Sequence, residues 1–169
     1  KYVWNYLAND TIGNSAFASS NRTLVIDTLN PTASFGTNPI EARNSSNSSI
    51  TFELKCSDNL GTVDYLAVYT NTTGSWHANQ TNSSPANDSY WNITVNSISN
   101  GYYVWASWCN DTAGNQDFTE TNRTLTIDIT SPTITLNNPT DITNSSSATV
   151  TFSGTCTDNL GTVDYCILY

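Results

Sequence analysis

The sequence "CNDTAGNQDFTETNRTLTIDITSPT" (109–133) gives the strongest indication of the fold, because it contains a clear strand pattern and occurs almost unchanged a second time in the chain. Within it, Leu125, Ile127 and Ile129 alternate with polar residues, which predicts a half-buried β-strand. The other copy is "ANDTIGNSAFASSNRTLVIDTLNPT" (8–32), which begins 101 positions earlier. Self-similarity at a fixed spacing indicates repeated structural units.

A second phrase is also repeated and sets the unit boundaries. "CSDNLGTVDYLAVY" begins at Cys56, and "CTDNLGTVDYCILY" begins 100 positions later at Cys156. The chain is therefore predicted to hold the C-terminal part of one unit in 1–30, a complete unit in 31–130 and the N-terminal part of the next in 131–169. We interpret it as a window from a longer array; the alternative is a subunit whose partial units complement a neighbour.

Alternation of apolar and polar residues extends through the complete unit, and helical periodicity is not convincing anywhere. About seven strands in roughly a hundred residues are typical of an immunoglobulin-like sandwich. The predicted fold class is all-β, as tandem immunoglobulin-like antiparallel β-sandwiches. The expected strands lie near 33–36, at 50–56, at 63–70, near 75–78, at 91–95, at 102–109 and at 124–129.

The phrase "NDTAGN" followed by "NRTLTIDITSPT" resembles the last hairpin and linker of tandem immunoglobulin-like repeats in prokaryotic surface proteins, particularly archaeal ones. The resemblance covers nearly the whole chain. It implies the sandwich fold and an extracellular or cell-surface location, and it implies no particular ligand. Similar surface repeats sometimes bind Ca²⁺ at the junctions between units.

The cysteines fit the same fold. Cys56 and Cys109 stand on core-facing strand positions, where an inter-sheet disulfide of an immunoglobulin fold belongs. Two buried free thiols are the alternative. Cys156 repeats Cys56, so its natural partner is expected beyond Tyr169; a bridge to Cys166 on a neighbouring strand is the less favoured option.

Composition excludes several classes of function. The 169 residues carry a net charge of −9, and the five Lys and Arg residues form no cluster. A basic face for nucleic acid is therefore absent from the sequence. No run of about 18 apolar residues predicts a membrane span. The single histidine, His77, has no evident carboxylate partner for a catalytic triad, so we expect no catalytic residue and no enzyme activity.

Asn-x-Ser/Thr sequons are about twice as frequent as this composition would give by chance. They predict a surface covered with N-linked glycans, although accidental sequons in an Asn-rich chain are the alternative. The twelve positions are Asn9, Asn21, Asn44, Asn47, Asn71, Asn79, Asn82, Asn87, Asn92, Asn110, Asn122 and Asn144.

Calcium is the one ligand that the sequence suggests, and no other cofactor is indicated. Asp27, Asp58, Asp111 and Asp128 fall in turns and at the predicted junctions. Carboxylates from several loops suit Ca²⁺. The competing interpretation is that these residues only form turns by accepting backbone hydrogen bonds.

The predicted function is structural: an N-glycosylated rod or filament of linked sandwiches outside the cell, with neighbouring identical repeats or subunits as its partners. The alternative is an adhesin or carbohydrate-binding module that uses exposed aromatic residues such as Trp76 and Tyr90.

Overall fold

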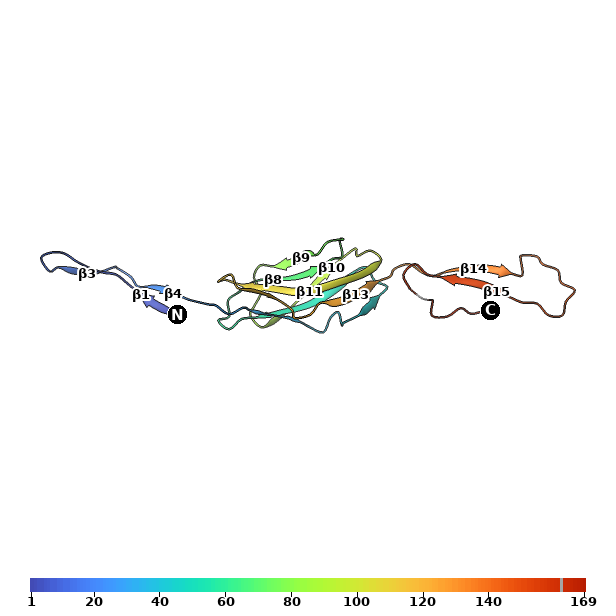
Figure 1. Ribbon diagram of the computed structural model, residues 1–169, viewed down its shortest axis with the longest axis horizontal. Helices are drawn as coiled ribbons and strands as arrows, with labels where there is room; N and C mark the ends of the chain where they lie inside the picture. The colour runs from blue at the N-terminus through green and yellow to red at the C-terminus, as the bar shows by residue number, and fades with distance from the viewer. Residues whose placement is uncertain (162) are drawn as a thin grey trace.

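The computed structural model describes residues 1–161 and 163–169 and contains only strands, turns and irregular segments in these ranges. The all-β prediction is therefore confirmed. Figure 1 shows a compact central body between two thin, extended ends. Within the described residues, no helix is long and apolar enough to cross a membrane.

The body comprises two sheets that enclose a shared core. Its strands are β5 (Thr32–Phe35), β6 (Arg43–Ser45), β7 (Ile50–Ser57), β8 (Val63–Thr70), β9 (His77–Asn82), β10 (Ser89–Val95), β11 (Gly101–Asp111), β12 (Gln116–Phe118) and β13 (Arg123–Ile127). One sheet has the order β10-β7-β5, and the other has the order β6-β13-β11-β8-β9, with β12 paired to β11. This is the strand order of an immunoglobulin-type sandwich.

One pairing departs from the antiparallel prediction. Strand β6 runs parallel to β13. The segment between β5 and β7 carries the chain from the edge of one sheet to the edge of the other. There it lies beside β13 and runs in the same direction.

Trp105 forms the centre of the core, and its side chain is fully buried. Its ring packs edge-on against Phe35 and Phe52, with centroids 4.7 and 4.9 Å away, which is the favourable geometry for aromatic pairs. A disulfide joins Cys56 to Cys109 across the core, with Cα atoms 6.3 Å apart.

Arg123, the arginine of the repeated "NRT" motif, has a structural role in the sandwich. Its guanidinium lies 4.3 Å from the Phe35 ring centroid and 5.7 Å from that of Trp105. It also donates hydrogen bonds to the carbonyls of Gly36 and Pro39, at 3.2 and 3.0 Å. The arginine therefore holds the sheet-crossing segment against the core by two cation–π contacts and two hydrogen bonds.

Three features differ from the sequence predictions. The strand expected near 75–78 begins later, as β9, and the short strands β6 and β12 were not expected. Cys156 is bonded to Cys166, with Cα atoms 6.6 Å apart, so the favoured prediction of a partner beyond Tyr169 is wrong for this structure. The two cysteines lie within disulfide reach because the chain turns back after β15 (Ser153–Thr157).

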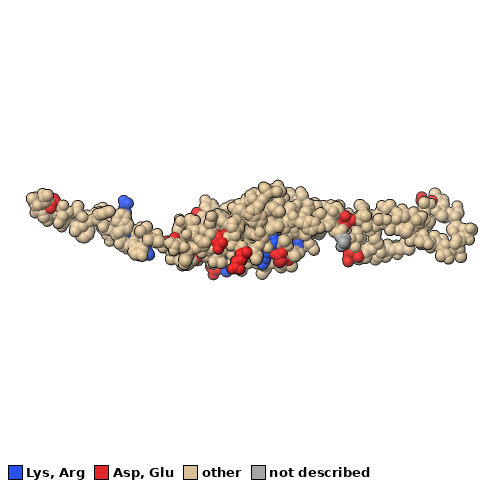
Figure 2. Space-filling view, in the orientation of Figure 1, with Lys and Arg blue, Asp and Glu red and all other residues tan. Residues whose placement is uncertain are grey.

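The two ends form open hairpins rather than sandwiches. Their strands are β1 (Tyr2–Trp4), β2 (Leu7–Asn9), β3 (Ser15–Phe17), β4 (Arg22–Leu24), β14 (Thr133–Asn138) and β15. Trp4, the repeat counterpart of the buried Trp105, is 43% exposed, and Phe152, the counterpart of the buried Phe52, is 57% exposed. Figure 2 shows few charged side chains on these ends. Each end thus presents apolar residues of the kind that fill the core of the central body.

Candidate metal centre

Three carboxylates meet at the end of the sandwich that adjoins the N-terminal hairpins. Asp27, Asp58 and Asp111 each offer an oxygen, and these oxygens all lie within 4.8 Å of one another. Asp27 precedes β5, Asp58 follows β7 and Asp111 ends β11. Three separate segments of the chain therefore contribute one carboxylate each, and we call this group the carboxylate cluster.

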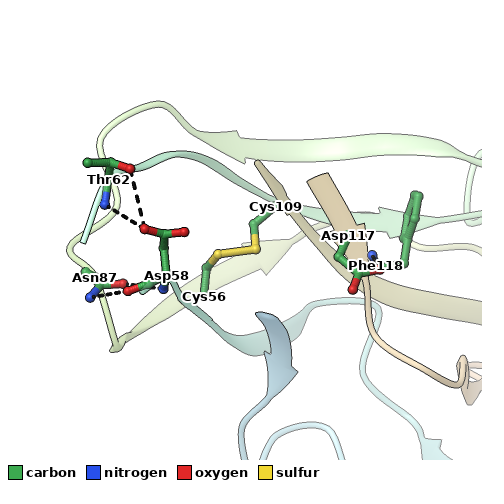
Figure 3. The surroundings of a disulfide bond; sticks show 7 residues. All are labelled: Cys56, Asp58, Thr62, Asn87, Cys109, Asp117 and Phe118. Atoms are coloured by element: carbon green, nitrogen blue, oxygen red, sulfur yellow. Dashed lines mark hydrogen bonds between the residues drawn. A yellow bond between two sulfur atoms is a disulfide. The ribbon is translucent and has the colours of Figure 1, made fainter. Parts of the chain in front are cut away.

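Asp58 is held by its own loop, one residue beyond the disulfide-bearing strand (Figure 3). Its Oδ2 accepts hydrogen bonds from the amides of Leu60 and Thr62, at 2.7 and 3.3 Å. Its amide donates to Asn87 Oδ1 at 2.7 Å. These bonds fix Oδ2 as a turn acceptor. Oδ1 is buried and has no hydrogen-bond partner.

Asp111 is held by the "DTAGN" turn. Its Oδ1 accepts from the amides of Ala113 and Asn115, both at 2.9 Å, and its Oδ2 accepts from Asn115 Nδ2 at 2.7 Å. Burial raises the pKa of Asp111, but the hydrogen bonds from Asn115, Ala113 and Gly114 outweigh this effect and lower the pKa below its ordinary value. The side chain is thus buried and held in its ionised form.

Asp27 connects the preceding segment to the sandwich. Asn115 Nδ2, which already bonds Asp111, also donates to the main-chain oxygen of Asp27 at 3.3 Å. Asp27 Oδ1 accepts from the amide of Leu29 at 3.2 Å. Asp27 Oδ2, like Asp58 Oδ1, is buried without a hydrogen-bond partner.

Within the part of the chain that the structure describes, no Lys or Arg side chain forms an ion pair with a member of the cluster. The one ion pair within the described residues joins Lys55 to Asp88, at 2.8 Å, and includes no member of the cluster. At 4.8 Å, two unit charges repel by about 3.5 kcal/mol with an effective dielectric constant of about 20. Buried polar atoms without partners are uncommon and require an explanation. A hard divalent cation would satisfy both unpartnered oxygens and offset the repulsion, and Ca²⁺ suits an all-oxygen donor set.

Of the four aspartates suggested by the sequence, the structure brings together three. Asp128 lies instead beside Asp158. The pKa of Asp158 is lowered, first by a hydrogen bond from the Leu160 amide and further by one from the Gly161 amide. Since Asp128 and Asp158 are the repeat counterparts of Asp27 and Asp58, the second junction reproduces two members of the cluster.

Sequence reasoning did not identify the residues that position the carboxylates. Asn115, Asn87 and Thr62 all bond to members of the cluster. Asn115 carried a usable signal, because it stands four residues after Asp111 in the repeated turn. Asn87 carried none, since it comes from a segment that occurs once in the chain.

The sequon asparagines lie at the surface, and none is buried. Most are exposed, whereas Asn71, Asn79, Asn82 and Asn110 are half-buried. Every sequon is therefore open to solvent to some degree, and no sequon asparagine fills the core.

The suggested binding aromatics lie apart. Trp76 joins an aromatic group on the outer face of the six-stranded sheet, with its ring 5.9 Å from that of Tyr69. Tyr90 lies on the outer face of the other sheet, where Lys55 Nζ is 5.3 Å from its ring centroid. His77 Nδ1 is 2.8 Å from the Ser75 carbonyl oxygen. The two aromatics therefore do not form one binding face.

No protein-family model matches this chain, and no curated protein matches it in sequence. Among solved structures, it is similar to the PKD domain of an M14-like peptidase from Thermoplasmatales archaeon SCGC AB-540-F20. The identity is 13% and the TM-score is 0.37, over 58% of this chain and 92% of that chain. A similarity this low identifies neither a family nor a function for the present chain.

Proposed function

We propose that this chain is a non-catalytic, structural segment of an N-glycosylated extracellular rod or filament, in which β-sandwiches follow one another and a Ca²⁺ ion stiffens the junction between them. The observation that carries the proposal is the carboxylate cluster. Asp27 belongs to the segment before the sandwich, whereas Asp58 and Asp111 belong to the sandwich itself. A cation bound by all three would tie the linker to the body.

The apolar faces of the two ends support the serial arrangement. Residues 2–29 repeat the sequence of 103–130, and the residues in 2–29 that correspond to buried core residues are exposed. In the central body, the segment 103–130 packs against β5 and β7. We propose that neighbouring units or subunits complete the core of each end, as one continuous array or by strand complementation between chains.

The extracellular location is proposed from chemistry. The structure contains two disulfides, and such bonds persist in oxidising compartments. The twelve sequons would carry glycans in the same setting. An adhesin remains the second candidate, because Trp76 belongs to an exposed aromatic group.

Calorimetric titration of the full chain with CaCl₂, after removal of metal with EDTA, tests the proposal. We expect saturable binding that is lost in Asp27→Asn and kept in Asp64→Asn, which removes a carboxylate outside the cluster. Equal heats for the wild type and Asp27→Asn would show that the linker carboxylate does not take part, and would overturn the proposed junction.

A further inference from the structure

Four aromatic side chains form a continuous surface on the outer face of the six-stranded sheet. This outer aromatic cluster consists of Tyr69, Trp76, Trp108 and Phe118. Tyr69 lies at its centre, with ring centroids 4.9 Å from Phe118, 5.9 Å from Trp76 and 6.0 Å from Trp108. Phe118 is 39% exposed and Trp76 is 43% exposed. Contiguous exposed aromatic surface of this kind marks a place where something binds.

The cluster faces away from the core because of strand alternation. Leu66, Val68 and Cys109 belong to the core, so their neighbours Tyr69 and Trp108 point to the opposite face. The fold therefore does not need these aromatic rings for its own core.

Asn110 lies on the same outer face, at the end of the cluster. It follows Trp108 by two residues, about 7 Å along the strand, and it pairs with Tyr65 on one side and Gln116 on the other. Directly opposed side chains in a sheet have Cβ atoms about 5 Å apart. Asn110 begins the sequon Asn110-Asp111-Thr112. A group attached to its amide would therefore emerge beside Trp108 and Tyr65.

The amide itself is not used by the fold. Asn110 is half-buried, and its Oδ1 is buried without a partner. Within the described residues, its side chain makes no hydrogen bond. Attachment of a sugar at Nδ2 would therefore break no bond in the part of the chain that the structure describes.

The surroundings match the chemistry of a saccharide. A sugar ring presents C–H groups on its faces and hydroxyls at its rim, and the negative face of an aromatic ring attracts C–H groups. The cross-strand neighbours Thr81, beside Ala67, and Gln116, beside Asn110, are uncharged hydrogen-bonding residues. A binding surface of apolar rings with a few polar groups is typical of such sites.

We propose that the N-glycan of Asn110 lies on the outer aromatic cluster of its own chain, with its first sugars against Tyr65 and Trp108 and the following ones towards Phe118 and Tyr69. This inference rests on the proposed N-glycosylation. Tethering makes the contact intramolecular, so a weak stacking interaction is sufficient to hold the sugar. The glycan then covers exposed aromatic surface that could otherwise join rods side by side.

The repeat provides an internal comparison. Asn9 is the counterpart of Asn110, but Leu7 stands where Trp108 does, and Phe17 takes the place of Phe118. A glycan on Asn9 would meet fewer aromatic rings. We therefore expect ordered sugars at Asn110 and freer ones at Asn9.

The test uses the glycosylated full chain, from its native source or from a host that modifies such sequons. Glycopeptide mass spectrometry gives the occupancy of each sequon, and two-dimensional NMR gives the chemical shifts of the sugar protons. We expect Asn110 to be occupied and its sugar protons to show upfield ring-current shifts. These shifts should be lost in Phe118→Thr and Trp108→Thr and kept in Tyr90→Thr, which removes an exposed aromatic from the other sheet.

The outcomes separate this inference from the proposed function. Occupancy elsewhere with an unmodified Asn110, or an occupied Asn110 without ring-current shifts, overturns the inference and leaves the calcium-stiffened rod untouched. If no sequon carries a glycan, the proposed glycosylated surface is also wrong. The calcium titration then remains an independent test of the proposed junction. Saturable binding of a free oligosaccharide to a chain with unmodified Asn110 also overturns it, and assigns the cluster to an external ligand.

Discussion

Replacing Asp58 by Asn should change the stability of the chain in opposite directions with and without calcium. The asparagine oxygen can take the place of Oδ2 and keep the bonds from Leu60 and Thr62. Its NH₂ group then replaces the unpartnered Oδ1 and can donate to a neighbouring carboxylate. The variant thus removes a charge from the cluster and adds a donor where none exists.

The magnitude follows from the geometry. Three carboxylates within 4.8 Å give three repulsive pairs of about 3.5 kcal/mol each at an effective dielectric constant of about 20, and the substitution removes two of them. Solvent screening reduces this gain, so we expect the metal-free variant to be about 2 kcal/mol more stable than the wild type. For a unit of this size, that raises the unfolding midpoint by roughly 10 °C.

Calcium should reverse the order. Saturation at about a hundred times Kd stabilises the wild type by about 2.7 kcal/mol, whereas the variant has lost a ligand and gains little. The assay is thermal unfolding followed by near-ultraviolet circular dichroism, in EDTA and in CaCl₂, with Asp64→Asn as the control. A variant that is less stable than the wild type by the same margin in both conditions would show that Asp58 acts only as a turn acceptor and not as a calcium ligand.

Four further results are expected. Replacing Cys56 and Cys109 together by Ser should lower the free energy of unfolding in urea by about 4 kcal/mol, since the bond spans 53 positions; a loss below about 1 kcal/mol would contradict this. Arg123→Lys should lower the free energy of unfolding by about 1–2 kcal/mol, because the bonds to Gly36 and Pro39 are lost. Arg22→Lys, in the exposed N-terminal hairpin, should lower it by less than about 0.5 kcal/mol. Equal losses would argue against a role of Arg123 in holding the sheet-crossing segment. The pKa of Glu53 is lowered by hydrogen bonds from the Thr37 side chain and amide. The ionised Glu53 side chain therefore stabilises the fold at neutral pH, and this stabilisation is lost as the pH falls through the folded-state pKa. Glu53→Gln should flatten the acid limb of the stability–pH profile, and an unchanged limb would contradict this. The intact mass of native material should exceed that of the bare chain after allowance for any additional sequence, and sequon peptides without sugars would argue against a glycan coat.

The sequence predicted those parts of the fold in which one face of a strand is buried. Ile50, Phe52 and Leu54 alternate with polar residues, and they lie in β7 with their side chains in the core. Strand β9 was placed too early because its sequence, His77–Asn82, contains no large apolar residue to set a period. Strands β6 and β12 were missed for a related reason. Both are three-residue pieces that pair at the margins of the six-stranded sheet.

The candidate site was only partly predictable. Repetition placed Asp27, Asp58, Asp111 and Asp128 in turns and at junctions, but it could not show which of them meet. The loops after β7 and β11 close on the segment before β5, which brings Asp27, Asp58 and Asp111 together. Asp128 follows β13, whose last residues pair with the start of β11 at the opposite end of the sandwich, and it lies near Asp158 there. The role of Asn115 depends on one amide bonding to two segments at once, and such a contact can be recognised only in three dimensions.

A crystal structure of the full chain, grown with calcium and measured for anomalous scattering, would show directly whether the carboxylate cluster binds the ion. We expect a single strong anomalous peak between Asp27, Asp58 and Asp111, within calcium–oxygen distance, about 2.3–2.6 Å, of one oxygen from each. A structure at saturating calcium with no peak there and with the carboxylates turned away from one another would rule out the calcium junction.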